Sequence, residues 1–176
     1  MNLILEDIDP KCFVYHQPVR NTVMDESEFM RVGYSTHLFA MNGIYTTMYL
    51  KGEVSDSFFN KSRVSYQLDT ENLEQIDNMI KMEKEVLSRA GITGRDEMTK
   101  LKEQLMSKSI RVFNNDPEGA LPITCENPEI VVKISGVWIT DRAYGLTFKF
   151  FNTFCIIFSS FMFSPSCQIE LKILSM

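Results

Sequence analysis

The sequence predicts a mainly β (α+β) domain in which two helices separate two sets of strands. Three segments support this fold class: an alternating one centred on Asn42-Gly43, a helically spaced one at about 69–108, and a second alternating one at 131–151. The chain has 176 residues, which suits one domain and is long enough to bury a core. We therefore expect a single domain over residues 1–151 with a helical insertion at about 69–108.

Residues 29–51 carry the clearest hairpin signal. Asn-Gly is the dipeptide most typical of a two-residue type I′ turn, because both central residues of that turn need positive φ. A two-residue loop at Asn42-Gly43 puts His37 and Met48 on the core side of the hairpin. The other side then holds three tyrosines, two threonines and a lysine: Tyr34, Tyr45, Tyr49, Thr36, Thr47 and Lys51.

Residues 52–68 predict a loop. Ser, Asp and Asn are frequent there, and Lys61 and Arg63 lie among them. A strand near Val64 to Leu68 is expected at the end of this loop.

Residues 69–108 predict two helices. Apolar residues recur every three or four positions after Asp69 or Thr70, either of which can cap the first helix, and Gly91 is a suitable stop. A second, shorter helix is expected over Asp96 to Met106.

Residues 131–151 predict another hairpin. A five-residue loop at 139–143 keeps apolar side chains on one face, whereas a four-residue loop mixes polar and apolar residues on both faces. Trp138 then belongs to the core, and Lys133 lies opposite Lys149 on the other face. Like charges directly opposite each other destabilise paired strands, and an anion between the two lysines removes that cost.

Residues 152–176 form an apolar C-terminal segment. We favour a buried strand pair, and a membrane contact or a sequence artefact stays open. The uncharged run from Phe150 to Phe163 is shorter than the roughly 20 residues that a membrane-spanning helix needs.

The composition limits the function classes. A net charge of −5 argues against a uniformly basic nucleic-acid binder, so any phosphate-binding surface has to come from local clustering of cations. The four cysteines and two histidines lack metal-ligand spacing, which predicts free thiols and no zinc site. The N-terminus has no signal-peptide pattern, so we expect an intracellular protein.

Catalytic motifs are not found in the sequence. It has no Gly-rich phosphate loop, no nucleophile elbow and no metalloprotease helix, and its acidic residues concentrate on the predicted helices, where they form a solvated face. We therefore expect no enzyme, no catalytic residue, no metal and no cofactor.

The remaining candidates are aromatic and basic side chains. Tyrosines on one strand face either pack under a loop or helix, or stack on the bases of single strands, since every base has a π-face. Nearby cations then contact phosphates. The candidate nucleic-acid-binding residues are Tyr34, Tyr45, Tyr49, Lys51, Lys61, Arg63, Lys133, Arg142 and Lys149.

The segment "VVKISGVWITDRAYGLTFKF" resembles the terminal strand pair of OB-fold single-stranded-DNA-binding proteins of phages, large DNA viruses and Polinton-like virus-derived elements. The shared pattern is an apolar strand, a Trp, a short loop and an aromatic-Gly-apolar strand, and it falls here on Ile134, Trp138, Tyr144, Gly145, Leu146 and Phe148. The hairpin "YSTHLFAMNGIYTTMYL" is also similar to part of that group. The resemblance implies an OB-like five-stranded barrel with a two-helix insertion. Members often end in an acidic tail that recruits replication proteins, whereas this chain ends in "QIELKILSM".

These observations favour sequence-tolerant binding of single-stranded DNA in the replication of a virus or virus-like element. The alternative is a non-enzymatic viral structural or protein-interaction protein, which would use the tyrosine face and the helices as interfaces. Replication proteins as partners and a homo-oligomer stay open, and a membrane partner is not expected. Clustering of the basic candidates on one surface favours DNA binding, and scattered positions favour the alternative.

Overall fold

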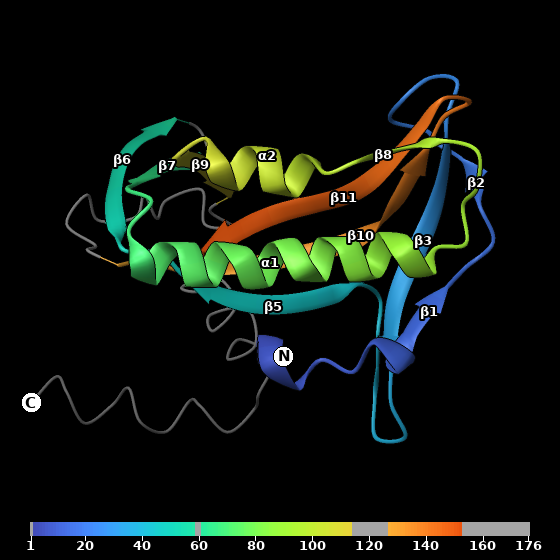
Figure 1. Ribbon diagram of the computed structural model, residues 1–176, viewed down its shortest axis with the longest axis horizontal. Coiled ribbons are helices and arrows are strands. Elements are labelled where there is room, and N and C mark those ends of the chain that lie inside the picture. Colours follow the sequence, from blue (N-terminus) through green and yellow to red (C-terminus); the bar gives the residue numbers. More distant parts are fainter. Residues whose placement is uncertain (1, 59–60, 114–126, 153–176) are drawn as a thin grey trace, which may run out of the picture.

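The computed structural model describes residues 2–58, 61–113 and 127–152, which form a large mixed sheet with two α-helices on one side (Figure 1). The strands are β1 (Phe13–Tyr15), β2 (Val19–Arg20), β3 (Glu28–Ser35), β4 (Ala40–Met41), β5 (Ile44–Tyr49), β6 (Gly52–Phe58), β7 (Lys61–Tyr66), β8 (Asp96–Met98), β9 (Ser109–Phe113), β10 (Glu129–Ile139) and β11 (Ala143–Asn152). The helices are α1 (Thr70–Arg89) and α2 (Lys100–Met106), and two short 3₁₀ turns, η1 (Leu5–Asp7) and η2 (Pro10–Cys12), precede β1. The mainly β prediction is confirmed.

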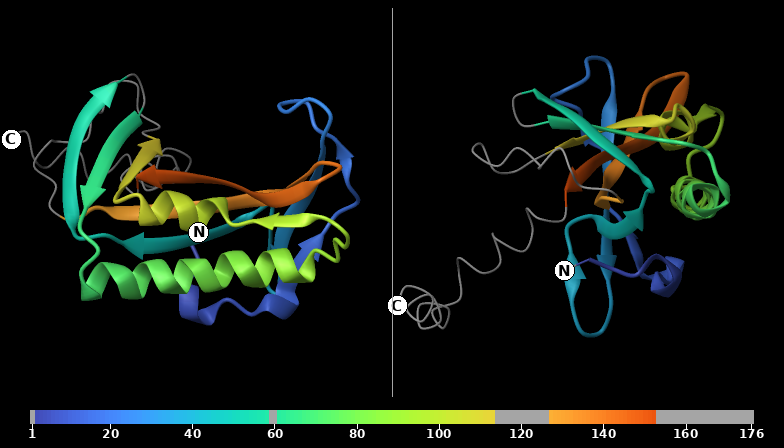
Figure 2. Two further views of the ribbon diagram at one scale, coloured as in Figure 1. Left: turned by 45° about the horizontal axis from the view of Figure 1, so that its top comes forward. Right: turned by 90° about the vertical axis from the view of Figure 1, so that its left-hand side faces the viewer.

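The sheet is built around β10 and has two open ends. Its strand order is β1-β3-β10-β11-β9-β7-β6, and β1 and β6 each pair with one neighbour only among the described residues. These pairings do not close into the five-stranded barrel that the family resemblance implies. Both helices lie against one side of the sheet (Figure 2), where Ile76, Met79 and Val86 of α1 are fully buried in the core.

A bulge in β10 separates two strand partners. One edge of β10 pairs with β11 throughout, and the other edge pairs with β5 over residues 129–134 and with β3 over residues 136–139. The β10–β11 register shifts by one residue between Ile134 and Gly136. The predicted five-residue loop at 139–143 is wrong, because Ile139 pairs with Tyr144 and leaves four residues between them. The predicted pairing of Lys133 with Lys149 is confirmed, because the extra residue of the bulge compensates for the shorter loop.

The bulge makes the core prediction for Trp138 wrong. An extra residue reverses the inward and outward positions that follow it. Val137 and Ile139 are therefore buried, at 0% and 3% exposure, and Trp138 lies on the opposite side of the sheet from the core.

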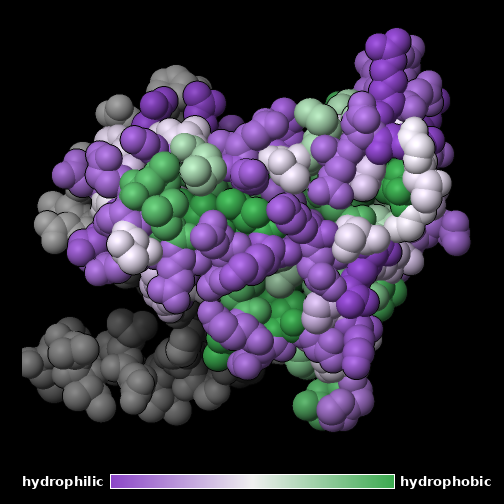
Figure 3. Space-filling model, viewed as in Figure 1, coloured by the Kyte–Doolittle hydropathy of each residue, from purple (hydrophilic) through white to green (hydrophobic). Residues whose placement is uncertain are grey.

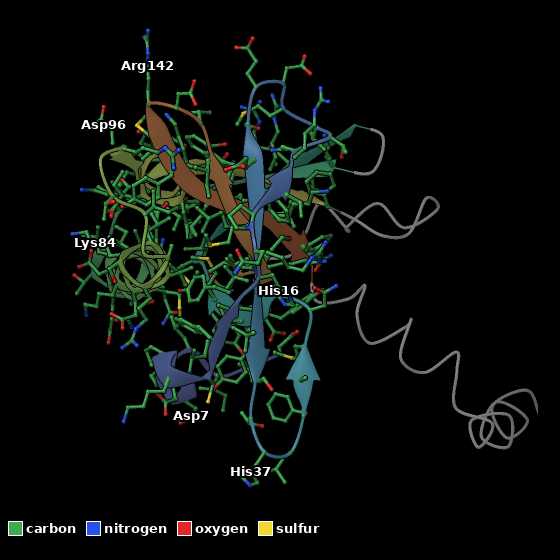
Figure 4. The ribbon with its side chains drawn as sticks, turned by 90° about the vertical axis from the view of Figure 1, so that its right-hand side faces the viewer. Asp7, His16, His37, Lys84, Asp96 and Arg142 are labelled. Atoms are coloured by element: carbon green, nitrogen blue, oxygen red, sulfur yellow. The ribbon has the colours of Figure 1, made fainter. Side chains whose placement is uncertain are left out.

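The prediction of a hairpin with its turn at Asn42-Gly43 is also wrong. β3 turns back into β4 through residues 36–39, where the Thr36 N–H donates to the Phe39 carbonyl at 2.9 Å. Gly43 connects β4 to β5, and β5 pairs with β10 instead of with β3. His37 is exposed at the tip of the β3–β4 loop rather than in the core (Figure 4).

The first helix forms where the sequence indicates. The Asp69 carboxylate accepts a hydrogen bond from the Asn72 N–H at 2.9 Å, and Gly91 follows the helix with a φ of 68°. The second helix is shorter than predicted, because residues 96–98 form β8, which pairs in parallel with β11. The buried Glu83 carboxylate of α1 accepts hydrogen bonds from the N–H groups of Leu101 and Lys102, the second and third residues of α2, at 2.9 Å each.

Residues 52–58 and 61–66 form strands β6 and β7 where a loop was predicted, and the strand expected near Val64 to Leu68 is confirmed in part, because β7 ends at Tyr66. The β6–β7 ladder begins with Gly52 opposite Tyr66 and contains its own register shift. Strand β7 continues the sheet by pairing with β9, so its basic residues are held in the sheet. Of the apolar segment 152–176, only Asn152 is among the described residues, and no helix in the described ranges is long and apolar enough to cross a membrane.

Candidate functional site

The side of the sheet opposite to the core carries most of the candidate residues, and we call it the outer face. Directly paired residues share a face, and so do residues two apart on one strand, which places the members by register. Lys133 pairs with Tyr45 and with Lys149, Phe151 pairs with Phe113, and Arg111 pairs with Arg63. The outer face comprises the cations Arg31, Lys61, Arg63, Arg111, Lys133 and Lys149 and the aromatic residues Phe29, Tyr45, Phe113, Trp138 and Phe151.

Two pairs of like charges stand directly across strands on this face. Lys133 lies opposite Lys149, and Arg63 lies opposite Arg111. Each such pair destabilises the sheet by a few tenths of a kcal/mol up to about 1 kcal/mol. The fold therefore tolerates positive charge at two places on one face.

Aromatic rings separate the cations. The Lys133 ammonium nitrogen lies 5.1 Å from the centre of the Tyr45 ring. The nitrogens of Lys61 and Lys149 lie 4.7 and 5.2 Å from the centre of the Phe113 ring, so one ring is shared by two cations. These distances are within the range of cation–π attraction, which holds the basic side chains close to the sheet.

The row of cations and rings continues to β3. Arg31 donates a hydrogen bond to the Asn42 side-chain oxygen at 2.8 Å, and its guanidinium carbon lies 5.8 Å from the centre of the Phe29 ring. The next residue, Gly43, lies against both Tyr45 and Lys133. Contacts thus connect β3 to β5, β10, β11, β9 and β7 along one face.

The ion pairs between described residues do not involve the cations of the outer face, although the register also puts the acidic residues Glu53 and Glu129 on that side. Within the described residues the ion pairs are Lys51–Glu71, Arg89–Glu85 and Lys100–Glu103. Each of these pairs involves a residue of α1 or α2, and none involves a cation of the outer face. The net charge of −5 is therefore distributed unevenly, as a local basic surface requires.

The structure brings together five of the nine predicted binding residues: Tyr45, Lys61, Arg63, Lys133 and Lys149. Tyr49 also points to the outer side, but its hydroxyl donates to the Glu129 carboxylate at 3.2 Å. The negative charge of Glu129 is the main cause that raises the pKa of Tyr49. Lys51 lies apart, 3.6 Å from Glu71 at the start of α1.

Two predicted residues do not belong to this face. Tyr34 is a correction, because it is only 4% exposed and its ring packs between Phe13 and Phe39. Its hydroxyl accepts a hydrogen bond from the Asp9 N–H at 3.2 Å. Arg142 lies exposed at the tip of the β10–β11 hairpin, beyond the last paired residues (Figure 4).

Sequence reasoning missed several members of the face. Phe29 and Arg31 alternate with buried residues in "EFMRVGYS", and Arg111 and Phe113 do so in "SIRVF". That alternation was a usable signal for both strands. Trp138 gave no such signal, because the bulge before it reverses the alternation.

The described residues contain no group of three or more His, Cys, Asp or Glu arranged to hold a metal ion. No family model, no curated protein and no solved structure matches this chain. The class that the structure defines is a mainly β domain with helices over one face of its sheet and a basic, aromatic outer face over the other.

Proposed function

We propose that the chain binds single-stranded DNA through its outer face, without preference for sequence. The observation that carries this proposal is the presence of two cross-strand like-charge pairs, Lys133–Lys149 and Arg63–Arg111, on one face with aromatic rings between them. A phosphate beside each pair turns a repulsion into two attractions. Rings beside the phosphates supply stacking surfaces for the bases.

The basic and the aromatic residues would contribute to binding in different ways. Lysine and arginine contacts to phosphate are independent of sequence and weaken as salt is added, because they release condensed counterions. Stacking on aromatic rings tolerates every base and releases few ions. The protein performs no reaction in this proposal and needs no cofactor.

The resemblance of the last hairpin to OB-fold single-stranded-DNA-binding proteins of viruses and virus-like elements supports the same function. The bulge in β10 adds support for an OB-like arrangement, since bulges bend the strands of small barrels. OB-folds are partly open barrels, and open sheet ends are compatible with that description. The proposed setting is DNA replication of such an element, in the host nucleus or cytoplasm.

Fluorescence anisotropy with labelled oligo-dT, oligo-rU and duplex DNA at two salt concentrations tests the proposal. We expect oligo-dT to bind more tightly than duplex DNA and its affinity to fall as salt rises. Equal, salt-independent binding of all three probes, or no binding, contradicts it.

A protein-interaction role is the second candidate, supported by a different surface. A hollow of about 370 Å³ lies between α1 and the N-terminal turns, lined by Leu5, Pro10 and Met82 and rimmed by Glu6, Asn78, Lys81 and Glu85. Figure 3 shows the helix-bearing side as mostly hydrophilic, with apolar side chains on both sides of α1. Apolar surface with a polar rim is typical of protein contacts.

A further inference from the structure

A second hollow lies at the β3 end of the outer face. It has a volume of about 460 Å³ and is lined by His16, Gln17, Val19, Phe29 and Arg31. This volume is within the range of small-molecule sites. Figure 4 shows His16 on the other side of β3 from Lys84 of α1, which is the side of the outer face.

The Phe29 ring is the aromatic member of the lining of this hollow. It lies against Gly136 of β10, where an added side-chain carbon would come within 2.7 Å of the ring. Val19 and Trp138 stand directly opposite Phe29 on the neighbouring strands. Trp138 in turn lies against Gly145 of β11. Each of the two rings therefore rests on a glycine of the neighbouring strand, where there is no side chain to displace it.

Polar groups line the rest of the hollow. Arg31 lies 5.8 Å from the ring centre and is positioned by its hydrogen bond to Asn42. His16 is held beside β3, because its backbone N–H donates to the Arg31 carbonyl at 3.0 Å. Its Nε2 is within 4.0 Å of the place where a side chain on Gly33 would begin. The imidazole of His16 and the amide of Gln17 offer both donors and acceptors.

We propose that this hollow binds one unpaired nucleobase, stacked on Phe29, with its hydrogen-bonding edge toward His16 and Gln17 and its phosphate at Arg31. The inference rests on the proposed function. It also explains why the protein would bind single-stranded DNA more tightly than duplex DNA. A paired base has its hydrogen-bonding edge occupied by its partner and its faces covered by its neighbours. Duplex DNA therefore offers the hollow nothing to bind.

Trp138 gives a direct readout, because it is the one tryptophan of the chain and stands beside Phe29. The probes are oligo-dT of about 12 nucleotides and an abasic oligonucleotide with the same number of phosphates. We expect both probes to bind, and only oligo-dT to change the fluorescence of Trp138. Phe29→Leu should weaken oligo-dT binding by about 5- to 150-fold, the loss that one stacked base predicts, and leave abasic binding unchanged.

Leu38→Ala is the control, since it shortens an exposed apolar side chain in the β3–β4 loop, outside the hollow, and should leave the affinity for both probes unchanged. If Phe29→Leu does not fold, as judged by circular dichroism, the double variant His16→Ala, Gln17→Ala replaces it. That variant should also weaken oligo-dT binding more than abasic binding.

The outcomes separate the two proposals. Equal affinity for oligo-dT and the abasic probe, with the same Trp138 fluorescence in both complexes, overturns the base site and leaves phosphate binding standing. No binding of either probe overturns the proposed function, and the base site falls with it.

Discussion

Replacing both Lys133 and Lys149 with Gln tests the outer face most directly. The change removes a cross-strand repulsion, which is worth about 0.2–1 kcal/mol of stability. It also removes two cation–π contacts, at 5.1 and 5.2 Å, each worth about 0.5–1 kcal/mol at an exposed site. The free energy of unfolding should therefore fall by no more than about 2 kcal/mol, as measured by urea denaturation.

The same variant should bind single strands much more weakly. Two phosphate contacts are lost, so the slope of log affinity against log salt should become shallower by about 1.4, at about 0.7 for each contact. Anisotropy titrations of labelled oligo-dT at several salt concentrations measure that slope. Weakening should be the same for every oligonucleotide sequence, because phosphates carry no sequence information.

A control variant with the same charge change comes from the helix-bearing side. Lys84→Gln with Lys102→Gln removes two exposed lysines of α1 and α2 and should leave both affinity and slope unchanged. An unaltered affinity and salt slope in the Lys133, Lys149 variant refutes the phosphate track. A comparable loss in both variants refutes it too, because net charge alone would then explain the binding.

Three further predictions concern single residues. Gly43→Val should destabilise the fold by about 1–3 kcal/mol, because Gly43 has a φ of 125° and a side-chain carbon there would lie 3.0 Å from the Ile134 carbonyl; an unchanged urea midpoint contradicts this. Burial raises the pKa of Glu83 above its ordinary value of 4.5, so the folded state holds its proton more tightly than the unfolded state, and this group's contribution to stability should decline as the pH rises from about 4.5 through the raised pKa. Glu83→Gln should abolish that decline, so the stability-pH curves of the two proteins should diverge as the pH rises above about 4.5, and parallel curves contradict this. Tyr45→Ala should weaken oligo-dT binding by about 1–3 kcal/mol with little change in salt slope, and a shallower slope would show that its contribution comes through Lys133.

Local signals in the sequence predicted local structure well. The first helix begins at its predicted cap, since capping depends on residues within one turn of each other. Lys133 and Lys149 pair as predicted because two departures from the predicted hairpin cancel: its loop is one residue shorter, and the bulge adds one residue to β10. Strand alternation correctly placed Tyr45 on the side of β5 away from the core.

Pairing partners were harder to predict than faces. Strand alternation shows which residues of a strand share a side of the sheet, but it does not show which other strand pairs with that strand. Asn42-Gly43 has the composition of a tight turn, yet Gly43 connects strands that pair with different neighbours. The acidic, serine-rich residues 52–58 were expected in a loop, and pairing with β7 makes them a strand.

The bulge in β10 also means that the position of Trp138 depends on counting residues and not on side-chain preference. Pairing Ser135 into a regular ladder would turn Trp138 inward and Val137 and Ile139 outward, whereas deleting Ser135 would leave all three on their present sides, because Gly136 would then follow Ile134 in the alternation. No hydropathy scale would report the difference between the bulged and the regular ladder, because every side chain is the same in both. Anyone grafting this surface onto another sheet would have to either copy the bulge or omit Ser135, together with copying the rings and cations.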